Sequence, residues 1–212
     1  MDFESFRREY SAGGLNRDML DACPVRQFEV WMEQALASEM IDPTAMVLST
    51  YAEASGPTQR IVLFKGFVDG GFAFYTNYNS NKGKAIAESA RVSLLFPWNA
   101  LDRQVIVSGR AVKVNPEVSR RYFASRPRES QIVACASLQS QQVESRSALE
   151  QAAANLRQAY EGREIPRPEH WGGFQVKPER MEFWQGGEHR LHDRFVYTLD
   201  GDANWSIKQL QP

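Results

Sequence analysis

The sequence predicts a closed or nearly closed antiparallel β-barrel with peripheral helices, an α+β fold. Segments rich in Val, Ile, Phe and Tyr follow one another at short spacing, with helix-like segments between them. Hydrophobic residues make up 42% and aromatic residues 11% of the 212 residues, which suffices for a sizeable core. We see no internal repeat and expect one domain over residues 23–212, preceded by a polar, mobile arm over residues 1–22.

The first part of the domain combines one helix with five strands. A helix over 24–38 is predicted by apolar residues at helical spacing, namely Val25, Phe28, Trp31, Met32, Ala35 and Leu36. The strands are expected at 45–51, 59–68, 72–77, 92–98 and 104–114. Asp69-Gly70-Gly71 predicts a hairpin turn between two of these strands.

Three further helices and three strands are expected. A short helix is predicted at 81–89. Asn115-Pro116 marks the next helix start, because Asn caps helices and Pro suits the first turn, and this helix should end before Pro127. A longer polar helix is predicted at 145–160, followed by a proline-containing connector at 164–168. The last strands are expected at 180–185, 194–199 and 205–210.

Charge and cysteine usage exclude several functional classes. The formal net charge is −1, which argues against a broad nucleic-acid-binding surface, so an anion site must be a local cluster of Arg and Lys. Cys23 and Cys135 form no CxxC pair, as is typical of a reducing cytoplasm. We see neither a secretory signal nor a membrane span. We therefore expect a cytoplasmic protein without nucleic-acid or membrane partners.

The stretch from Phe183 to Arg194 has the composition of a ligand site. Its glycines let the backbone approach a ligand closely. Arg190 and Arg194 carry forked donors that suit phosphate or an oxygen-rich ring. His192 can give or take a proton near neutral pH. The alternative is a surface turn with solvated charges before the last strands.

This stretch resembles the C-terminal signature of the pyridoxine/pyridoxamine 5'-phosphate oxidase family, through Phe183-Trp184-Gln185-Gly186 and Arg190-Leu191-His192-Asp193-Arg194. Upstream blocks match in the same order over nearly the whole chain: Arg7-Arg8-Glu9-Tyr10, Asp42-Pro43-Thr44-Ala45-Met46, Arg60-Ile61-Val62-Leu63-Phe64-Lys65, Phe74-Tyr75-Thr76-Asn77, Arg103-Gln104-Val105, Tyr122-Phe123, Ser125-Arg126-Pro127-Arg128 and Trp171-Gly172-Gly173-Phe174.

The resemblance implies the split-barrel FMN-binding fold and a homodimer with flavin at the subunit interface. It implies FMN-dependent oxidation of pyridoxine 5'-phosphate and pyridoxamine 5'-phosphate to pyridoxal 5'-phosphate, with molecular oxygen reduced to hydrogen peroxide. Two alternatives stay open. One is a split-barrel flavin-binding protein without oxidase activity, and the other is a flavin oxidoreductase with a different substrate.

Two cations bracket an apolar strand core at Arg60 and Lys65. Positions five apart on one strand point to opposite faces, so we do not expect both side chains to hold the same phosphate. Two edge charges in water are the alternative. The resemblance implies that Arg60 faces the flavin phosphate and Lys65 the substrate phosphate. It also implies that Ile61, Val62 and Lys65 contact the flavin.

A second set combines Tyr122, Arg126 and Ser130. The first two are four positions apart and share a helix face, and Ser130 follows the break at Pro127. A guanidinium between two hydroxyls suits a phosphate monoester. The alternative is a helix C-terminus with a favourable cation near its dipole. The resemblance implies that this set joins Lys65 in binding the substrate phosphate.

The resemblance assigns further roles by position. It places Arg190 and His192 at the reacting carbon as catalytic and substrate-binding residues, and Arg7 and Tyr10 in a lid over the substrate. It assigns residues from two subunits to FMN: Tyr75, Thr76, Lys82, Gln104, Gln139, Ser140, Trp184 and Arg194. We expect no metal, because arginines stand among the ligand-like residues of the His189-x-x-His192 pair.

The chain departs from the family at several positions. Asn81 stands where the family usually has arginine, directly before Lys82. Val133 and Cys135 replace a usual glycine and a larger apolar residue, and Gln141-Gln142 interrupts a usual serine-rich run. These differences bear on flavin affinity and local loop shape more than on the type of reaction.

Overall fold

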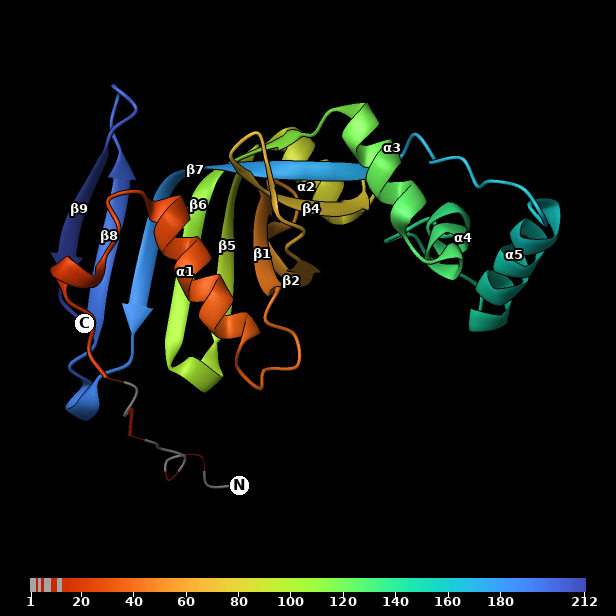
Figure 1. Ribbon diagram of the computed structural model, residues 1–212. Helices are drawn as coiled ribbons and strands as arrows, with labels where there is room; N and C mark the ends of the chain where they lie inside the picture. The colour runs from red at the N-terminus through yellow and green to blue at the C-terminus, as the bar shows by residue number, and fades with distance from the viewer. Residues whose placement is uncertain (1–2, 4, 6–8, 11–12) are drawn as a thin grey trace.

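The computed structural model describes residues 3, 5, 9–10 and 13–212. In this described part of the chain, one antiparallel sheet of nine strands carries helices at its periphery (Figure 1). The strands are β1 (Ala45–Ala52), β2 (Gly56–Leu63), β3 (Phe67–Val68), β4 (Gly71–Asn77), β5 (Arg91–Trp98), β6 (Arg103–Lys113), β7 (Trp171–Gln185), β8 (Asp193–Leu199) and β9 (Trp205–Leu210). The α-helices are α1 (Pro24–Leu36), α2 (Asn81–Glu88), α3 (Pro116–Ser125), α4 (Arg128–Ala136) and α5 (Arg146–Ala159), and short 3₁₀ turns are η1 (Arg17–Met19), η2 (Asn99–Leu101) and η3 (Glu188–Arg190).

The sheet branches at the long strand β7. The strand order is β2-β1-β5-β6-β7-β4-β3, and β8 and β9 continue from the second half of β7. β7 pairs with β4 through residues 171–176, with β8 through residues 180–185, and with β6 along most of its length. Among the described strands no ladder joins β2 to β3, so the barrel stays open at this edge. The predicted antiparallel barrel is confirmed in this open form.

The main core lies between α1 and the sheet. Helix α1 crosses the sheet over β5 and β6 (Figure 1) and buries Phe28, Trp31, Met32 and Ala35, the positions that predicted it. The Phe28 ring meets Phe72 and Phe96 at 4.8 Å between ring centroids. Such edge-to-face contacts add to the stabilisation that burial of these large apolar surfaces provides. The helix therefore covers the apolar core on this side of the sheet.

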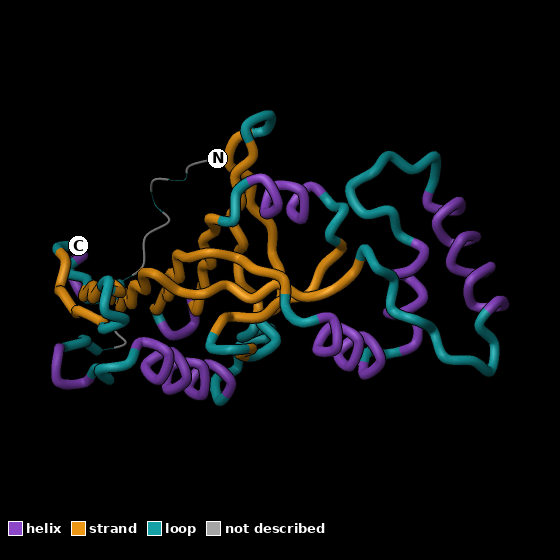
Figure 2. The backbone as a smooth tube through the Cα atoms, turned by 90° about the horizontal axis from the view of Figure 1, so that it is seen from above, coloured by secondary structure: helices purple, strands orange, loops and turns teal. Residues whose placement is uncertain are grey.

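A second, smaller core lies under α3, α4 and α5 at the other end of the molecule (Figures 1 and 2). Its buried members are Phe123, Ile132, Ala153, Ile165 and Trp171. Helix α4 was not predicted, because Pro127 marked the end of α3. Proline also suits the residue before a helix, and here Pro127 caps α4. This helix carries Ser130 and one wall of the pocket described below.

Two strand predictions need correction. β2 ends at Leu63 rather than at residue 68, since Gly66 adopts a left-handed backbone conformation with φ of 92°. β7 begins at Trp171 rather than at Arg180. Its first part contains Gly172 and Gly173, which lack the side chains that signal a strand in a sequence. Pairing with β4 and β6 imposes the strand conformation here.

The end of the predicted arm packs against the domain. Leu15 and Leu20 are buried, and the Leu15 amide donates to the Asp193 carboxylate at 2.8 Å. The Tyr197 hydroxyl donates to the Asp21 carbonyl at 2.7 Å. Much of the first twelve residues lies outside the described part, and the mobility of the arm stays a prediction. The boundary at residue 22 falls within a packed segment.

The Tyr197 contact predicts a loss of stability in alkali. Burial raises the pKa of the Tyr197 hydroxyl far above its ordinary value. The unfolded chain releases this proton near pH 10, before the folded chain does, so stability is full below about pH 10 and falls above it. Urea unfolding should show a free energy of unfolding that falls as the pH rises from about pH 10 to pH 11. Tyr197→Phe should be less stable at pH 8 by about 1 kcal/mol, because it loses the Asp21 contact, yet lose less on going to pH 11. If the free energies of unfolding of the wild type and of Tyr197→Phe fall equally with pH, Tyr197 is not the group responsible for the loss.

Candidate functional site

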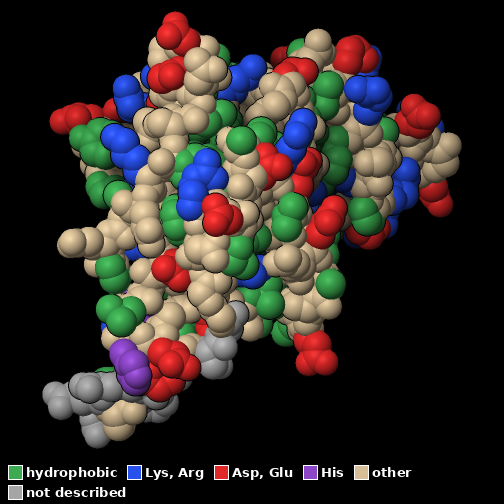
Figure 3. All heavy atoms as spheres, turned by 60° about the vertical axis from the view of Figure 1, so that its left-hand side comes forward, with side chains coloured by type: hydrophobic (Ala, Val, Ile, Leu, Met, Phe, Trp, Pro, Cys, Tyr) green, Lys and Arg blue, Asp and Glu red, His purple; other side chains and the backbone are tan. Residues whose placement is uncertain are grey.

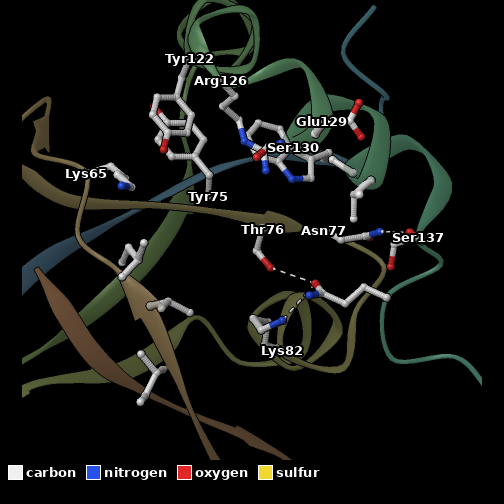
Figure 4. Close-up of a pocket in the computed structure, with 17 residues that line it drawn as sticks. Lys65, Tyr75, Thr76, Asn77, Lys82, Tyr122, Arg126, Glu129, Ser130 and Ser137 are labelled. Atoms are coloured by element: carbon white, nitrogen blue, oxygen red, sulfur yellow. Dashed lines mark hydrogen bonds between the residues drawn. The ribbon is translucent and has the colours of Figure 1, made fainter. Parts of the chain in front are cut away.

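A pocket of about 580 Å³ lies where β2 and β4 meet α2, α3 and α4 (Figure 4). Ten of its lining residues were predicted from the sequence: Ile61, Val62, Lys65, Tyr75, Thr76, Lys82, Tyr122, Arg126, Ser130 and Gln139. The others were missed: Leu63, Asn77, Glu129, Val133, Ala134, Ser137 and Trp171. The pocket therefore unites residues from the predicted substrate set and the predicted flavin set.

One end of the pocket carries the predicted substrate-phosphate set. Lys65 lies near the Tyr75 and Tyr122 rings, and Arg126 and Ser130 face the same space from α3 and α4 (Figure 4). Arg126 ends α3, and its carbonyl accepts a hydrogen bond from the Gln131 side chain at 2.8 Å. This contact fixes the backbone from which the guanidinium projects.

The Arg126 guanidinium has unmet hydrogen-bonding capacity. Its Nη1 atom is buried and has no hydrogen-bond partner among the described residues. Burial lowers the pKa of Arg126, and the side chain nevertheless stays charged because guanidinium begins from a very high pKa. Burial also raises the pKa of Tyr122, which keeps its hydroxyl protonated and able to donate. This end of the pocket suits an anion with several oxygen acceptors.

The opposite end of the pocket carries Lys82 at the start of α2. The Lys82 ammonium donates to the Gln139 side-chain oxygen at 3.1 Å and to the Ser80 hydroxyl at 3.3 Å (Figure 4 shows the Gln139 contact). The Thr76 hydroxyl donates to the same Gln139 oxygen at 3.3 Å. Burial and the nearby Arg60 charge lower the pKa of Lys82. A partly buried lysine beside a second cation and neutral acceptors is an arrangement that attracts an anion.

Arg60 stands behind this end rather than in the pocket wall. Its guanidinium donates to the Leu48 carbonyl at 3.0 Å and to the Thr50 and Thr58 hydroxyls at 2.8 and 2.6 Å. Because β2 ends at Leu63, strand alternation does not extend to Lys65, and the reasoning that separated the two cations by alternation was wrong. The structure nevertheless leaves Lys65 in the pocket wall and Arg60 outside it.

Ser140 also lies beside the pocket rather than in its wall. Its hydroxyl accepts a hydrogen bond from the Asn81 amide at 3.2 Å, which ties the 139–140 turn to the start of α2. Asn81 itself is exposed next to Lys82. Of the other departures from the family, Val133 lines the pocket, whereas Cys135 packs with the second core.

Glu129 is an acidic residue in the wall of this cationic pocket. Its carboxylate accepts two hydrogen bonds from Arg157 of α5, at 3.1 and 2.8 Å, and this contact lowers the pKa of Glu129. Arg157 offsets a negative charge that would otherwise oppose an anion in the pocket. No sequence spacing reveals this pair, because its members belong to separate helices.

A second group of predicted residues lies around Trp184, near the end of β7. The Trp184 and His192 rings are 4.8 Å apart, and Tyr10 packs edge-on against both at 5.6 and 5.3 Å. The His192 Nδ1 atom accepts from the Gly187 amide at 3.1 Å, which leaves Nε2–H free to donate. Gly186 lacks a side chain where a Cβ would lie 2.7 Å from the Tyr10 ring.

Arg190 projects from a strained turn beside this group. Its φ is 66° and that of the preceding His189 is 54°, in the left-handed region that non-glycine residues rarely occupy. The Arg190 guanidinium is exposed and lies 5.9 Å from the centre of the Tyr10 ring. Two successive non-glycine residues in this conformation make the backbone of this turn strained.

Gln104 and Arg194 lie on the strands next to Trp184. Both pair with Trp184 across the sheet, Gln104 from β6 and Arg194 from β8. Arg194 also pairs with the buried Glu182 carboxylate at 2.9 Å and donates to the Gln211 carbonyl at 3.0 Å. Arg7 lies outside the described residues.

The two groups are not brought together within one chain. The pocket is lined by residues of α3 and α4, and the Trp184 group lies where β7 pairs with β8. Helices α3 and α4 and strand β8 lie at opposite ends of the molecule (Figures 1 and 2). β7 connects them, with Trp171 at one end and Gln185 at the other. A site that uses both groups therefore requires two chains.

The surface is of mixed charge. Acidic and basic side chains are interspersed over the face shown in Figure 3. Within the described residues, no three His, Cys, Asp or Glu side chains gather to hold a metal ion. None of the described helices has the length and apolar character that crossing a membrane requires.

The open barrel is the fold of the split-barrel FMN-binding proteins. An FMN binding protein from Nostoc punctiforme, described as related to pyridoxamine 5'-phosphate oxidase, has this fold, with a TM-score of 0.70 at 12% identity over 91% of this chain and 100% of that chain. PhzG from Burkholderia lata, solved in complex with tetrahydrophenazine-1-carboxylic acid, has a TM-score of 0.86 at 30% identity over 92% of this chain and 95% of that chain.

Sequence similarity identifies the family. Residues 32–160 match the family model for pyridoxamine 5'-phosphate oxidase, and residues 171–212 match the C-terminal dimerisation region of pyridoxine 5'-phosphate oxidase. A pyridoxine/pyridoxamine 5'-phosphate oxidase from Idiomarina loihiensis is 52% identical over the full length of both chains. One from Rubrobacter xylanophilus is 49% identical over 100% of this chain and 97% of its own. The chain belongs to the pyridoxamine 5'-phosphate oxidase family, and the resemblance seen in the sequence is confirmed. The dimerisation region supports the predicted homodimer.

Proposed function

We propose that the protein oxidises pyridoxine 5'-phosphate and pyridoxamine 5'-phosphate to pyridoxal 5'-phosphate with FMN as its cofactor. The observation that carries this proposal is a single pocket with two separate cationic ends, Lys82 with Arg60 behind it and Lys65 with Arg126. Two such ends match two phosphates, one on the cofactor and one on the substrate. Full-length relatives that bear the name of this oxidase support the same reaction.

The residues at the α2 end fit the phosphate of FMN. Lys82 is partly buried, its hydrogen-bond partners among the described residues are neutral oxygens, and it repels Arg60. A phosphate beside the Lys82 ammonium would offset that repulsion. Thr76 and Gln139 add polar groups beside the ammonium. Trp184 and Gln104 would come from the partner subunit and supply an apolar surface and a hydrogen-bonding group for the flavin ring.

The protein contributes binding, orientation and charge to the reaction. FMN supplies the two-electron redox chemistry when it is bound. Lys65, Arg126 and Ser130 hold the substrate phosphate and so fix the distance of the reacting carbon from it. His192 presents Nε2–H toward the ring of the substrate, and Arg190 offers a fixed positive charge for electrostatic stabilisation. Arginine is a poor base at its high pKa, which leaves orientation as its role.

The active site is assembled from two subunits. The Trp184 group of one chain would complete the pocket of the other, which places the flavin at the subunit interface. Light scattering of the FMN-loaded protein should give the mass of a dimer, with two flavins per dimer. A monomer that keeps stoichiometric FMN would refute this arrangement.

Flavin reduction under anaerobic conditions tests the reaction directly. The purified protein should be yellow, and pyridoxine 5'-phosphate should bleach its flavin absorbance. Readmitted oxygen should restore the colour and yield hydrogen peroxide. A protein that binds FMN but is not bleached by either phosphorylated vitamer would be a flavin-binding protein or an oxidoreductase with another substrate. The likeness to PhzG, which was solved with tetrahydrophenazine-1-carboxylic acid, motivates the alternative of an oxidoreductase with another substrate. A cytoplasmic location stays a prediction, supported by two unpaired cysteines.

Because the Asn81 side chain carries no charge, we expect FMN to bind more weakly than it would with arginine at this position. Asn81 is exposed beside Lys82, so Asn81→Arg adds a second cation near the phosphate. We expect FMN to bind about fivefold more tightly, since an exposed charge contributes roughly 1 kcal/mol or less. The gain should shrink at high salt. FMN titration of both apo-proteins at two ionic strengths measures it, with Asn79→Arg as the control at a nearby position. Unchanged affinity at low salt would show that position 81 does not face the phosphate.

A further inference from the structure

The motif Trp171-Gly172-Gly173 has no role in the site as described so far, although Trp171 lines the pocket. We propose that Trp171 is a positioning residue for the substrate phosphate, acting through Arg126. The flat face of its indole holds the Arg126 guanidinium in the orientation that directs its remaining donors toward the phosphate. This inference rests on the proposed function.

The geometry places the guanidinium on the indole. The Arg126 Cζ atom lies 4.6 Å from the centre of the Trp171 ring, within the range of a cation–π contact. Trp171 is only 6% exposed, so solvent screens this contact little. Arginine suits this arrangement because a planar guanidinium can stack on a ring and still donate from its edge. The face of the Arg126 guanidinium contacts Trp171, and its edge stays available to donate to the phosphate.

The indole belongs to an ordered aromatic stack. Tyr75 and Tyr122 stack on one another at 3.8 Å, and the Trp171 plane is inclined by only 14° to Tyr75 and by 5° to Tyr122. Tyr122 is itself a predicted phosphate ligand. The same stack therefore orients one hydroxyl and one guanidinium toward the substrate-phosphate end of the pocket.

Gly173 makes room for this stack, and Gly172 makes room for the neighbouring Tyr78. A Cβ on Gly173 would lie 2.8 Å from the Tyr75 ring, and a Cβ on Gly172 would collide with the Tyr78 hydroxyl. Any side chain at these positions would push Tyr75 or Tyr78 out of place. The Trp-Gly-Gly motif thus supplies one flat surface and the space that its neighbours need.

The state of Arg126 indicates a missing ligand. The buried Nη1 atom has no partner within the described part of the chain, although the backbone of Arg126 is fixed by Gln131. If Trp171 served only to fill the second core, the guanidinium above it would be expected to pair with a nearby carboxylate. Glu129 also lines this pocket and is bound to Arg157 instead. The arrangement keeps Arg126 oriented and available.

The test is a double-mutant cycle between Trp171→Leu and Arg126→Ala. Trp171→Leu should raise the KM for pyridoxine 5'-phosphate about tenfold through loss of the stacked contact, while kcat and the Kd for FMN change less than about twofold. In the Arg126→Ala background the same substitution should raise KM little further. Competition by inorganic phosphate should weaken in parallel in the Trp171→Leu protein.

Ile165→Ala is the matched control. Ile165 belongs to the same core cluster and is not among the residues that line the pocket. It should lower thermal stability without changing KM. Trp171→Phe, which keeps an aromatic face, should raise KM less than leucine and serves if the leucine variant does not fold. Additive effects of Trp171→Leu and Arg126→Ala, or equal losses of FMN and substrate affinity, would overturn the inference. A wild-type protein that is not reduced by the phosphorylated vitamers would instead refute the proposed function.

Discussion

Arg126→Ala should raise the KM for pyridoxine 5'-phosphate by tenfold or more and leave FMN bound. A hydrogen bond to a charged group contributes roughly 1.5–3 kcal/mol, which corresponds to a loss of about 10- to 100-fold in affinity. The effect should be large here because the Arg126 Nη1 atom is buried and has no other partner among the described residues. Steady-state kinetics with the phosphorylated vitamers and FMN titration of the apo-protein give the two numbers to compare.

A second arginine on the same helix provides the control. Arg120 of α3 is exposed and paired with Glu117, and it does not line the pocket. Arg120→Ala removes the same charge from the same helix and should leave KM nearly unchanged. Equal losses of substrate and FMN affinity in Arg126→Ala would show that the two phosphate sites are wrongly assigned. If Arg120→Ala raised KM by the same factor, the rise in KM of Arg126→Ala would come from the loss of net charge rather than from a lost contact with the substrate.

His192→Ala and Arg190→Ala should slow flavin reduction by roughly 10- to 100-fold without releasing FMN. His192 is oriented by the Gly187 amide and by the rings of Trp184 and Tyr10, so its ring is fixed before substrate arrives. Arg190 is exposed, so its replacement by alanine leaves the core packing unchanged. Anaerobic stopped-flow measurement of the flavin absorbance isolates this step from reoxidation.

His189 offers a neighbouring control on the same turn. Its side chain is exposed, and its φ of 54° is one that asparagine accepts readily. His189→Asn should therefore keep the turn and the reduction rate. If the reduction rates of His192→Ala and Arg190→Ala both match wild type, these residues do not act at the reacting carbon. A rate loss in His189→Asn of equal size would point to the shape of the turn rather than to the two side chains.

The sequence predicted those parts of the fold that depend on local pattern. Helix α1 follows from apolar spacing, the turn after Asp69 from its glycines, and the start of α3 from Asn115-Pro116. Helix α4 was missed because proline both ends one helix and precedes the next. The first half of β7 was missed because tertiary pairing, rather than the propensity of Gly172 and Gly173, makes it a strand. The open edge of the barrel also depends on long-range pairing that no local pattern records.

The site was predictable where spacing or resemblance assigned a residue. Tyr122 and Arg126 share a helix face at a separation of four, and the structure places both in the pocket. The Glu129–Arg157 pair and the Trp171 contact join distant segments, so neither could be read from spacing. The division of the site residues into two groups at opposite ends of β7 was equally hidden. It follows from how far one strand extends across the sheet.

The length of strand β7 sets the spacing between the two groups of site residues. β7 fixes how far the aromatic stack at Trp171 lies from Trp184, and side chains alternate faces on either side of one bulge. A one-residue bulge opposite Ser108 and Gly109 is already built in, at the place where Pro178 cannot donate to a ladder. One more inserted residue would turn one end of the strand over relative to the other, so that Trp184 or Trp171 faced the wrong way. Substitutions along β7 change a contact, whereas a change in its length would misalign both halves of the dimer at once.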